Sequence, residues 1–317
     1  MTRIVVLDDY QGVAHRFGGW ERLPAGCEVV YSHEHLDSLD AVCDALSGAE
    51  VAIAMRERTP LGGAHFERLS ELKLLVTTGM ANAAIDVAAA ASAGIVVCGT
   101  GGNPRATVEH AWALILALAR SIPNEDAGMR AGAWQRTIGT DLSGSILGLV
   151  GFGRLGSAMA PVALAFGMEV LAWSQNLDPA AAAEAGAEAV DKTELFERAD
   201  FVSVHYRLSP RSKSLVGVEE LARMKPSAFL INTSRGPLVD RDALLAGLNA
   251  GEIAGAALDV YDVEPLPADD PFRRAQHTVL SPHLGYVTAD TYSTFYSEAV
   301  EDILAYLDGN PIRVLSA

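Results

Sequence analysis

The chain has 317 residues, half of them apolar and a fifth charged, so a packed globular protein with two domains of ordinary size is expected. Its formal net charge of −16 opposes binding to nucleic acid or to an anionic membrane, because both need clustered Lys and Arg. The three cysteines lack metal-ligand spacing and no apolar run reaches the roughly 18 residues of a membrane span, which predicts a reducing compartment and, by default, the cytoplasm.

Strand-like apolar runs alternate with helical patterns from the start of the chain. Runs at 4–7, 51–55, 72–77 and 95–98 are predicted strands, and a helix over 85–93 ends before Gly94. Asn103 and Pro104 then predict the start of a long helix that is apolar on most faces and therefore buried. That helix is predicted to run to about Ser121, with Pro123 ending it.

A second alternating series begins at Ser145. Its predicted strands are 146–150, 168–173, 201–204, 229–232, 256–260 and 279–280, and a last helix spans about 288–307. Such alternation predicts an α/β fold with two doubly wound, Rossmann-like parallel sheets. The second domain, 101–286, is predicted to be inserted into the first, which comprises 1–100 and a returning C-terminal helix within 287–317.

The sequence GFGRLG at 151–156 lies between a predicted strand and a predicted helix, and this context makes a common motif specific. Gly151 allows the tight turn, Gly153 lets the backbone approach a pyrophosphate, and Gly156 lets helix and strand pack closely. The phosphates would meet free N–H groups at the positive end of a helix. The sequence therefore predicts a dinucleotide site.

The choice between NAD and NADP is less clear from the sequence. An acidic residue normally ends the second strand of such a domain and bonds the ribose 2′-OH, but this chain has WSQN at 173–176. No carboxylate there repels a 2′-phosphate and no arginine there binds one, while Arg207 could reach the adenosine end or be a solvated surface charge. NAD is favoured, with NADP left open.

Three later segments each place one chemically able residue just after an apolar run. They are INTSRG at 231–236, DVYDVEP at 259–265 and SPHLG at 281–285, which carry Arg235, Glu264 and His283. An imidazole suits the removal of a hydroxyl proton near neutral pH, so His283 is the candidate acid/base, and Arg235 could grip a substrate carboxylate in bidentate fashion. Together with the nucleotide turn, this set predicts hydride transfer on a small carboxylic acid.

At this point the chain resembles the D-isomer-specific 2-hydroxyacid dehydrogenases over essentially its whole length. The resemblance rests on Gly79, on Ile85-Asp86, on Val108-Glu109-His110, on the glycine turn and on the three segments above. It implies an NAD(P)-dependent enzyme that acts on the CH–OH group of a small-molecule D-2-hydroxy acid or on its 2-oxo acid. It also implies a substrate domain, a coenzyme domain, an active site between them and usually a homodimer.

The resemblance also implies individual roles. Glu264 matches the residue that orients the catalytic imidazole, and Asp259 matches a residue that bonds the nicotinamide carboxamide. Substrate contacts are implied for Arg58 and for the loop of Gly79 and Met80, although Ala81 stands where many members have a second glycine. No metal constellation is apparent. The predicted coenzyme-binding residues are Gly151, Gly153, Arg154, Leu155, Gly156, Ser174, Arg207, Thr233 and Asp259.

Two other functions remain open from the sequence. The fold could serve a dinucleotide-sensing, corepressor-like binding protein with little or no turnover. An L-specific lactate or malate dehydrogenase is disfavoured, because that group has its nucleotide turn near the N-terminus, whereas here it lies in mid-chain. Formate or phosphonate dehydrogenases of the same superfamily are further alternatives within the enzyme class.

Overall fold

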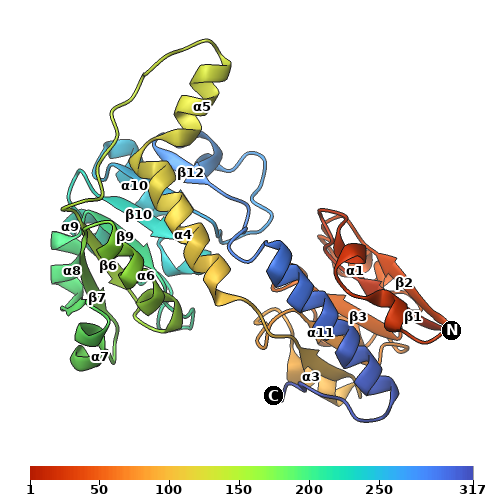
Figure 1. Ribbon diagram of the computed structural model, residues 1–317. Helices are drawn as coiled ribbons and strands as arrows, with labels where there is room; N and C mark the ends of the chain where they lie inside the picture. Colours follow the sequence, from red (N-terminus) through yellow and green to blue (C-terminus); the bar gives the residue numbers. More distant parts are fainter. Residues whose placement is uncertain (317) are drawn as a thin grey trace. The chain divides into compact units, whose positions relative to one another are not determined.

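The computed structural model describes residues 1–316, which divide into two compact units (Figure 1). The first unit comprises Met1–Asn103 and the chain from Thr288 onward, and the second comprises Pro104–Val287. Each unit is built on one parallel sheet covered by helices, which confirms the predicted α/β class. Among residues 1–316, no helix combines the length and the apolar character needed to cross a membrane.

The first unit holds a five-stranded sheet with the order β2-β1-β3-β4-β5, in which all neighbours pair in parallel. This is the order of flavodoxin-like doubly wound sheets. Its strands are β1 (Thr2–Val6), β2 (Cys27–Tyr31), β3 (Val51–Ala54), β4 (Leu74–Thr77) and β5 (Val96–Gly99). Its helices are α1 (Leu39–Ala45), α2 (Gly63–Phe66), α3 (Val87–Ser92) and α11 (Ala289–Leu307).

Alternation along these strands gives the sheet two apolar faces, as expected for a parallel sheet covered on both sides. One face packs against buried side chains of α1, α2 and α3. The long helix α11 covers the sheet at β4, and Figure 1 shows it lying across the strands. Thr288 caps α11, and its hydroxyl oxygen accepts the N–H of Thr291 at 3.3 Å, which is why the helix begins there.

The second unit holds a seven-stranded parallel sheet with the order β12-β11-β10-β9-β6-β7-β8. Six of its strands follow the Rossmann order, with one more strand added at the edge. The strands are β6 (Ile146–Val150), β7 (Glu169–Trp173), β8 (Glu188–Ala189), β9 (Phe201–Val204), β10 (Phe229–Asn232), β11 (Gly255–Leu258) and β12 (Thr278–Leu280). The predicted strands at 146–150, 201–204 and 229–232 have these same limits.

Two apolar cores cover the faces of this sheet. The helices α4 (Pro104–Ala119) and α6 (Arg154–Ala165) pack on one face, with Leu147, Leu149 and Ile231 beneath them. On the other face lie α8 (Lys192–Arg198), α9 (Val218–Arg223) and α10 (Arg241–Ala250). The remaining helices of this unit are α5 (Ile122–Arg130) and α7 (Pro179–Glu184).

The prediction that Pro123 ends the long buried helix is wrong. Helix α4 ends at Ala119, and Ser121 takes a left-handed conformation with φ +50°. Pro123 then lies in the first turn of α5, where its missing N–H costs nothing because that donor would have no partner within the helix. The proline therefore starts a helix here.

A buried ionic cluster fastens the C-terminal tail to the first unit. The tail pairs along β5, where Leu315 N–H donates to the carbonyl of Val97 at 2.8 Å. Arg313 donates through Nε to Oδ1 of the fully buried Asp302 at 2.9 Å, and Oδ2 of Asp302 has no hydrogen-bond partner among the described residues. Burial raises the pKa of Asp302 to about 7, with repulsion from Glu298 and Glu301 adding to it and Arg313 opposing it.

This cluster makes stability depend on pH. The folded state binds a proton at Asp302 more tightly than the unfolded chain does, so this group's contribution to stability is lost as pH rises from about 4 towards 7. A single group can give a slope of at most about 1.4 kcal/mol per pH unit. We expect Asp302→Asn to flatten the fall in unfolding free energy, measured by urea denaturation between pH 5 and 8. Asp290→Asn, an exposed change on the same helix, is the control, and equal slopes in both variants would refute the assignment.

Candidate functional site

The register of the second sheet aligns one residue from each of five strands at its carboxyl edge. Val150 lies beside Val204, which lies beside Asn232, which pairs with Leu258, and Leu258 pairs with Leu280. The next residue along each strand therefore joins a single row, on the face covered by α4 and α6. The row consists of Gly151, His205, Thr233, Asp259 and Ser281.

The glycine turn after β6 leaves room for a ligand and for close packing. Gly151 has φ +99°, and a Cβ there would lie 2.6 Å from the carbonyl oxygen of His205. Gly153 borders open space and caps α6, so the first N–H groups of that helix have no side-chain partner. A Cβ on Gly156 would overlap the carbonyl oxygen of Gly151. Of the two neighbouring residues in the motif, Arg154 is exposed and Leu155 packs against the core.

β7 ends at Trp173, at the place where many dinucleotide domains carry an acid, and Trp173 stacks on Tyr206, which follows β9. The rings of Trp173 and Tyr206 are stacked, with centroids 5.8 Å apart and an interplanar angle of 15°. The ammonium of Lys192 lies 5.7 Å from the Trp173 ring centroid. Ser174 is half-buried and Arg207 is exposed. Neither the residues directly after β7 nor Tyr206 and Arg207 after β9 present a carboxylate that could bond a ribose hydroxyl.

Two buried polar atoms in the row have no hydrogen-bond partner among residues 1–316. One is Oγ1 of Thr233, and the other is Nδ1 of His205, whose Nε2 lies 2.8 Å from the hydroxyl oxygen of Ser203. Burial lowers the pKa of His205 to about 4, so its ring is neutral at physiological pH. An unpaired buried polar group costs about 1–3 kcal/mol, so these atoms mark a place where a ligand can supply what the chain does not.

His283 and Glu264 are brought together by the ends of β12 and β11. Nδ1 of His283 lies 2.6 Å from Oε2 of Glu264, and Oε1 of Glu264 accepts the N–H of Tyr261 at 2.8 Å. The His283 ring also meets the ring of Tyr286 edge-on at 5.4 Å. His283 has φ +55°, which costs on the order of 1–3 kcal/mol for a residue with a side chain and persists only where its surroundings hold it.

Arg235 follows the neighbouring strand, β10. Its Nη1 donates to the carbonyl of Ser234 at 2.7 Å, and its own carbonyl accepts Nδ2 of Asn232 at 3.0 Å. The next residue, Gly236, packs so closely that a Cβ there would overlap the backbone of Tyr261. The turn that carries Arg235 therefore lies directly against the loop that carries Glu264.

Asp259 follows β11, the strand between β10 and β12, and is almost completely buried. Its Oδ1 accepts the hydroxyl of Ser281 at 2.6 Å and the N–H of Leu284 at 2.7 Å, and its Oδ2 accepts the N–H of Gly285 at 2.8 Å. Nε2 of His110, on α4, lies 3.1 Å from Oδ1 and 3.0 Å from the Ser281 hydroxyl. Burial alone would raise the pKa of Asp259, but the hydrogen bonds outweigh it and hold the pKa below its usual range.

The three residues predicted to bind substrate lie at strand ends of the first unit. Arg58 follows β3, and its guanidinium carbon lies 4.5 Å from the centroid of the Tyr10 ring. Gly79 follows β4 with φ +92°, and its N–H donates to the Thr100 hydroxyl at 2.9 Å, so this donor is already engaged within the chain. Met80 is 51% exposed. Each of these roles stays a prediction.

Sequence reasoning gave no role to His110, Ser281 or His205, all of which belong to the polar row or contact it. His110 lies 149 positions from Asp259 in the sequence, and no local sequence pattern predicts a contact over that separation. The available signal was the position of Ser281 two residues before His283, at the end of a predicted strand. Within residues 1–316, no group of three or more His, Cys, Asp or Glu residues could hold a metal ion.

Comparison with known proteins identifies the family of the chain. Residues 112–285 match the family model described as D-isomer specific 2-hydroxyacid dehydrogenase, NAD binding domain. The chain is 38% identical to a D-3-phosphoglycerate dehydrogenase of Synechocystis over 83% of its own length, and 38% identical to a glyoxylate reductase of Thermococcus litoralis over 77%. It spans about half (48%) of the first relative and 76% of the second.

Among solved structures, a phosphoglycerate oxidoreductase from Vibrio cholerae superposes with a TM-score of 0.93 at 34% identity. That superposition covers 98% of this chain and all of the other. The match extends to both units, whereas the family model covers the second unit alone. The predicted family and the predicted NAD cofactor are thereby confirmed: the chain belongs to the D-isomer specific 2-hydroxyacid dehydrogenases.

Proposed function

We propose that this protein transfers a hydride between NAD and C2 of a small D-2-hydroxy acid or its 2-oxo acid. The observation that carries the proposal is the 2.6 Å contact between Nδ1 of His283 and Glu264, at the carboxyl edge of a sheet whose first turn is a dinucleotide fingerprint. Relatives named D-3-phosphoglycerate dehydrogenase and glyoxylate reductase support a small acid of this class as substrate. Glyoxylate and hydroxypyruvate are the simplest candidates.

Features of the second unit itself fit a bound NAD. Open space beside Gly153 and the uncapped N–H groups of α6 suit a pyrophosphate, so the glycine turn with Arg154 and Leu155 would hold that part. The orphaned Oγ1 of Thr233 lies in the same row and would meet the nicotinamide end. Ser174 and Arg207 would lie at the adenosine end, where the lack of a carboxylate also admits NADP.

The hydrogen bond to Glu264 fixes which nitrogen of His283 carries its proton. A carboxylate oxygen can only accept, so Nδ1 carries the hydrogen and Nε2 is the atom that exchanges a proton with substrate. In oxidation, Nε2 takes the proton of the C2 hydroxyl, and Glu264 stabilises the imidazolium that forms. When NAD is bound, its nicotinamide ring would accept the hydride from C2. In reduction, the imidazolium returns its proton to the C2 oxygen.

Arg235 would bind the substrate carboxylate. A guanidinium offers parallel donors that match a carboxylate, and one of its nitrogens is already oriented by the Ser234 carbonyl. Holding the acid in this way fixes C2 relative to His283, which bonds Glu264 on the loop that packs against the Arg235 turn. We assign Arg58 and the loop of Gly79 and Met80 to substrate binding as well, with Gly79 contributing its left-handed turn because its N–H is engaged.

Variants at the proposed catalytic residues test the function. We expect wild-type protein to oxidise NADH in the presence of one or more acids from a 2-oxo acid panel, and NADPH is tested beside it. His283→Ala should lower kcat by roughly 10²–10⁴-fold, because general acid–base catalysis contributes that much. Arg235→Lys should raise KM for the acid, because the bidentate contact is lost. Both should bind NADH as the wild type does, measured by fluorescence titration.

The matched control is His277→Asn, which changes an exposed histidine just before β12, at the opposite end from His283. It should leave turnover unchanged. Tight coenzyme binding without turnover on any acid of the panel would contradict the proposal and favour the dinucleotide-sensing alternative.

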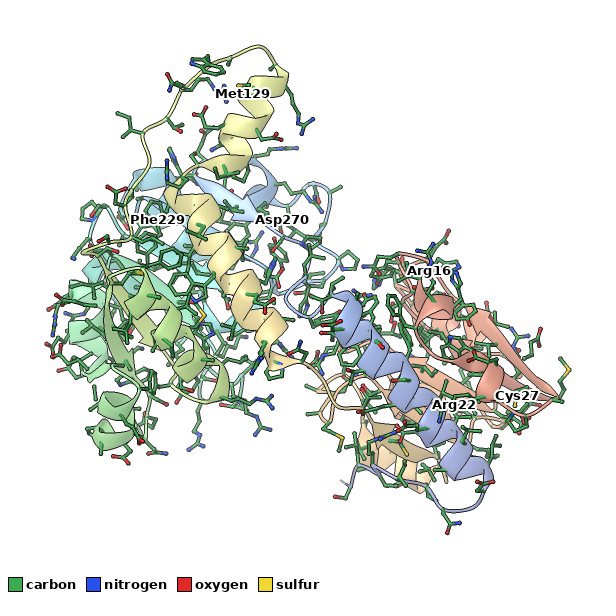
Figure 2. All side chains as sticks on the ribbon, in the orientation of Figure 1. Arg16, Arg22, Cys27, Met129, Phe229 and Asp270 are labelled. Atoms are coloured by element: carbon green, nitrogen blue, oxygen red, sulfur yellow. The ribbon has the colours of Figure 1, made fainter. Side chains whose placement is uncertain are left out.

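We also propose that the protein is a homodimer, assembled through α5 and the loop over 131–141. Figure 2 shows Met129 on α5, on a part of the second unit that extends away from its sheet. Trp134 is 73% exposed and Ile138 is 99% exposed, so this arm presents large apolar side chains to water. The loop is nevertheless held in shape, since the Thr137 hydroxyl donates to Glu125 at 2.7 Å. A shaped apolar arm is suited to cover a second copy.

Charging this arm should separate the copies. We expect the double variant Trp134→Glu, Ile138→Glu to run as a monomer by light scattering coupled to gel filtration, while the wild type runs as a dimer. Val218→Glu, at a 68% exposed apolar residue on α9, should leave the mass unchanged. A monomeric wild type, or a double variant that stays dimeric, would contradict this assignment.

A further inference from the structure

We propose that His110 and Asp259 form a clamp that positions His283 by holding the Ser281 side chain before it and the backbone N–H groups of Leu284 and Gly285 after it. This inference deepens the proposed function and rests on the assignment of His283 as acid/base. The clamp consists of His110 on α4, Asp259 after β11 and Ser281 after β12, which lie within hydrogen-bond distance of one another. It acts on the loop backbone, and Glu264 acts on the imidazole ring.

Counting hydrogen bonds shows that the Asp259 carboxylate is held by four groups of the chain itself. Its two oxygens accept from the Ser281 hydroxyl, the N–H of Leu284, the N–H of Gly285 and Nε2 of His110. Three of these donors share Oδ1 and one reaches Oδ2, so the chain fully occupies Oδ1 and leaves one acceptor site on Oδ2. Oδ1 of Asp259 therefore has a structural role before any coenzyme is present.

The same hydrogen-bond count shows which ring nitrogen of His110 carries a hydrogen. The single hydroxyl hydrogen of Ser281 is given to Asp259 at 2.6 Å, so the Ser281 oxygen can only accept from His110. Nε2 of His110 must then carry a hydrogen, which it shares between Ser281 and Asp259. His110 thus ties α4 to the ends of both β11 and β12.

The clamped atoms bracket His283 in sequence. Ser281 lies two residues before it, and Leu284 and Gly285 follow it directly. His283 has φ +55°, a conformation that a residue with a side chain keeps only when its surroundings impose it. The loop is also tightly packed after His283, since a Cβ on Gly285 would lie 3.1 Å from Asp259 and 3.4 Å from Thr107 of α4.

Loss of His110 should therefore loosen this loop and misplace Nε2 of His283, while the glycine turn that would hold the coenzyme stays intact. A small displacement of an acid/base group can cost about 100-fold in rate. We expect His110→Leu to lower kcat by about 10- to 100-fold with NADH affinity within about 2-fold of wild type. His110→Gln can place a donor near the position of Nε2 and should recover most of the loss.

Two further readouts separate a positioning role from a merely structural one. The amides of Leu284 and Gly285 should exchange hydrogen at least about 10-fold faster in His110→Leu, because their acceptor is no longer held in place, and more slowly again in His110→Gln. The pH profile of kcat/KM should change shape in His110→Leu and return towards wild type in His110→Gln. His277→Asn should change none of these quantities.

The outcomes decide the matter in each case. Unchanged kcat, unchanged amide exchange, or a rise in the NADH dissociation constant that matches the loss of kcat would overturn the clamp, the last in favour of a coenzyme contact alone. Should His110→Leu fail to fold, Ser281→Ala removes one donor from the same carboxylate and is held to the same criteria. If no acid is turned over even by wild type, the proposed function fails, and amide exchange still decides whether the clamp exists.

Discussion

Parallel pairing of β6, β9, β10, β11 and β12 in register is the constraint on which the site depends. Because all five strands run the same way, the residue that follows each of them emerges at the same edge and on the same face. Gly151, His205, Thr233, Asp259 and Ser281 become neighbours although 130 positions separate the first from the last (281 − 151). A one-residue slip in any strand would send its member of the row to the opposite face.

Three buried aspartates show how donor number decides the state of a carboxylate inside this acidic protein. Asp259 receives four hydrogen bonds, and they outweigh burial and lower its pKa. Asp8 receives hydroxyl hydrogen bonds from Thr59 and Tyr10, which do not offset burial, and its pKa is raised. Asp302 has one oxygen without a partner, and burial raises its pKa to about 7. Burial raises the pKa at all three sites, and the direction of the shift depends on the hydrogen bonds that oppose burial and, at Asp302, on the added repulsion from Glu298 and Glu301.

Much of the fold was predictable because the information was local. Apolar runs gave β6, β9 and β10 their limits, and the helix predicted over about 288–307 matches α11 closely. The half-buried edge strand β2 was not predicted, and Pro123 was misread, since a proline can end one helix or begin the next. At the site, resemblance paired Glu264 with His283, and the 2.6 Å contact agrees. The link from His110 to Asp259 was not predictable, because it is created by packing α4 against the sheet.

The supports of His283 differ in what they control. Glu264 bonds Nδ1, so it sets the tautomer and the rotation of the ring. Asp259 bonds the Ser281 hydroxyl before His283 and the N–H groups of Leu284 and Gly285 after it, so it sets where the ring is attached. A ring that is oriented but badly placed, or well placed but free to rotate, would present Nε2 poorly to a hydroxyl proton, since proton transfer needs hydrogen-bond distance and direction together. Because both carboxylates follow β11, the end of one strand controls both the orientation and the placement of a residue in the loop after the next strand, β12.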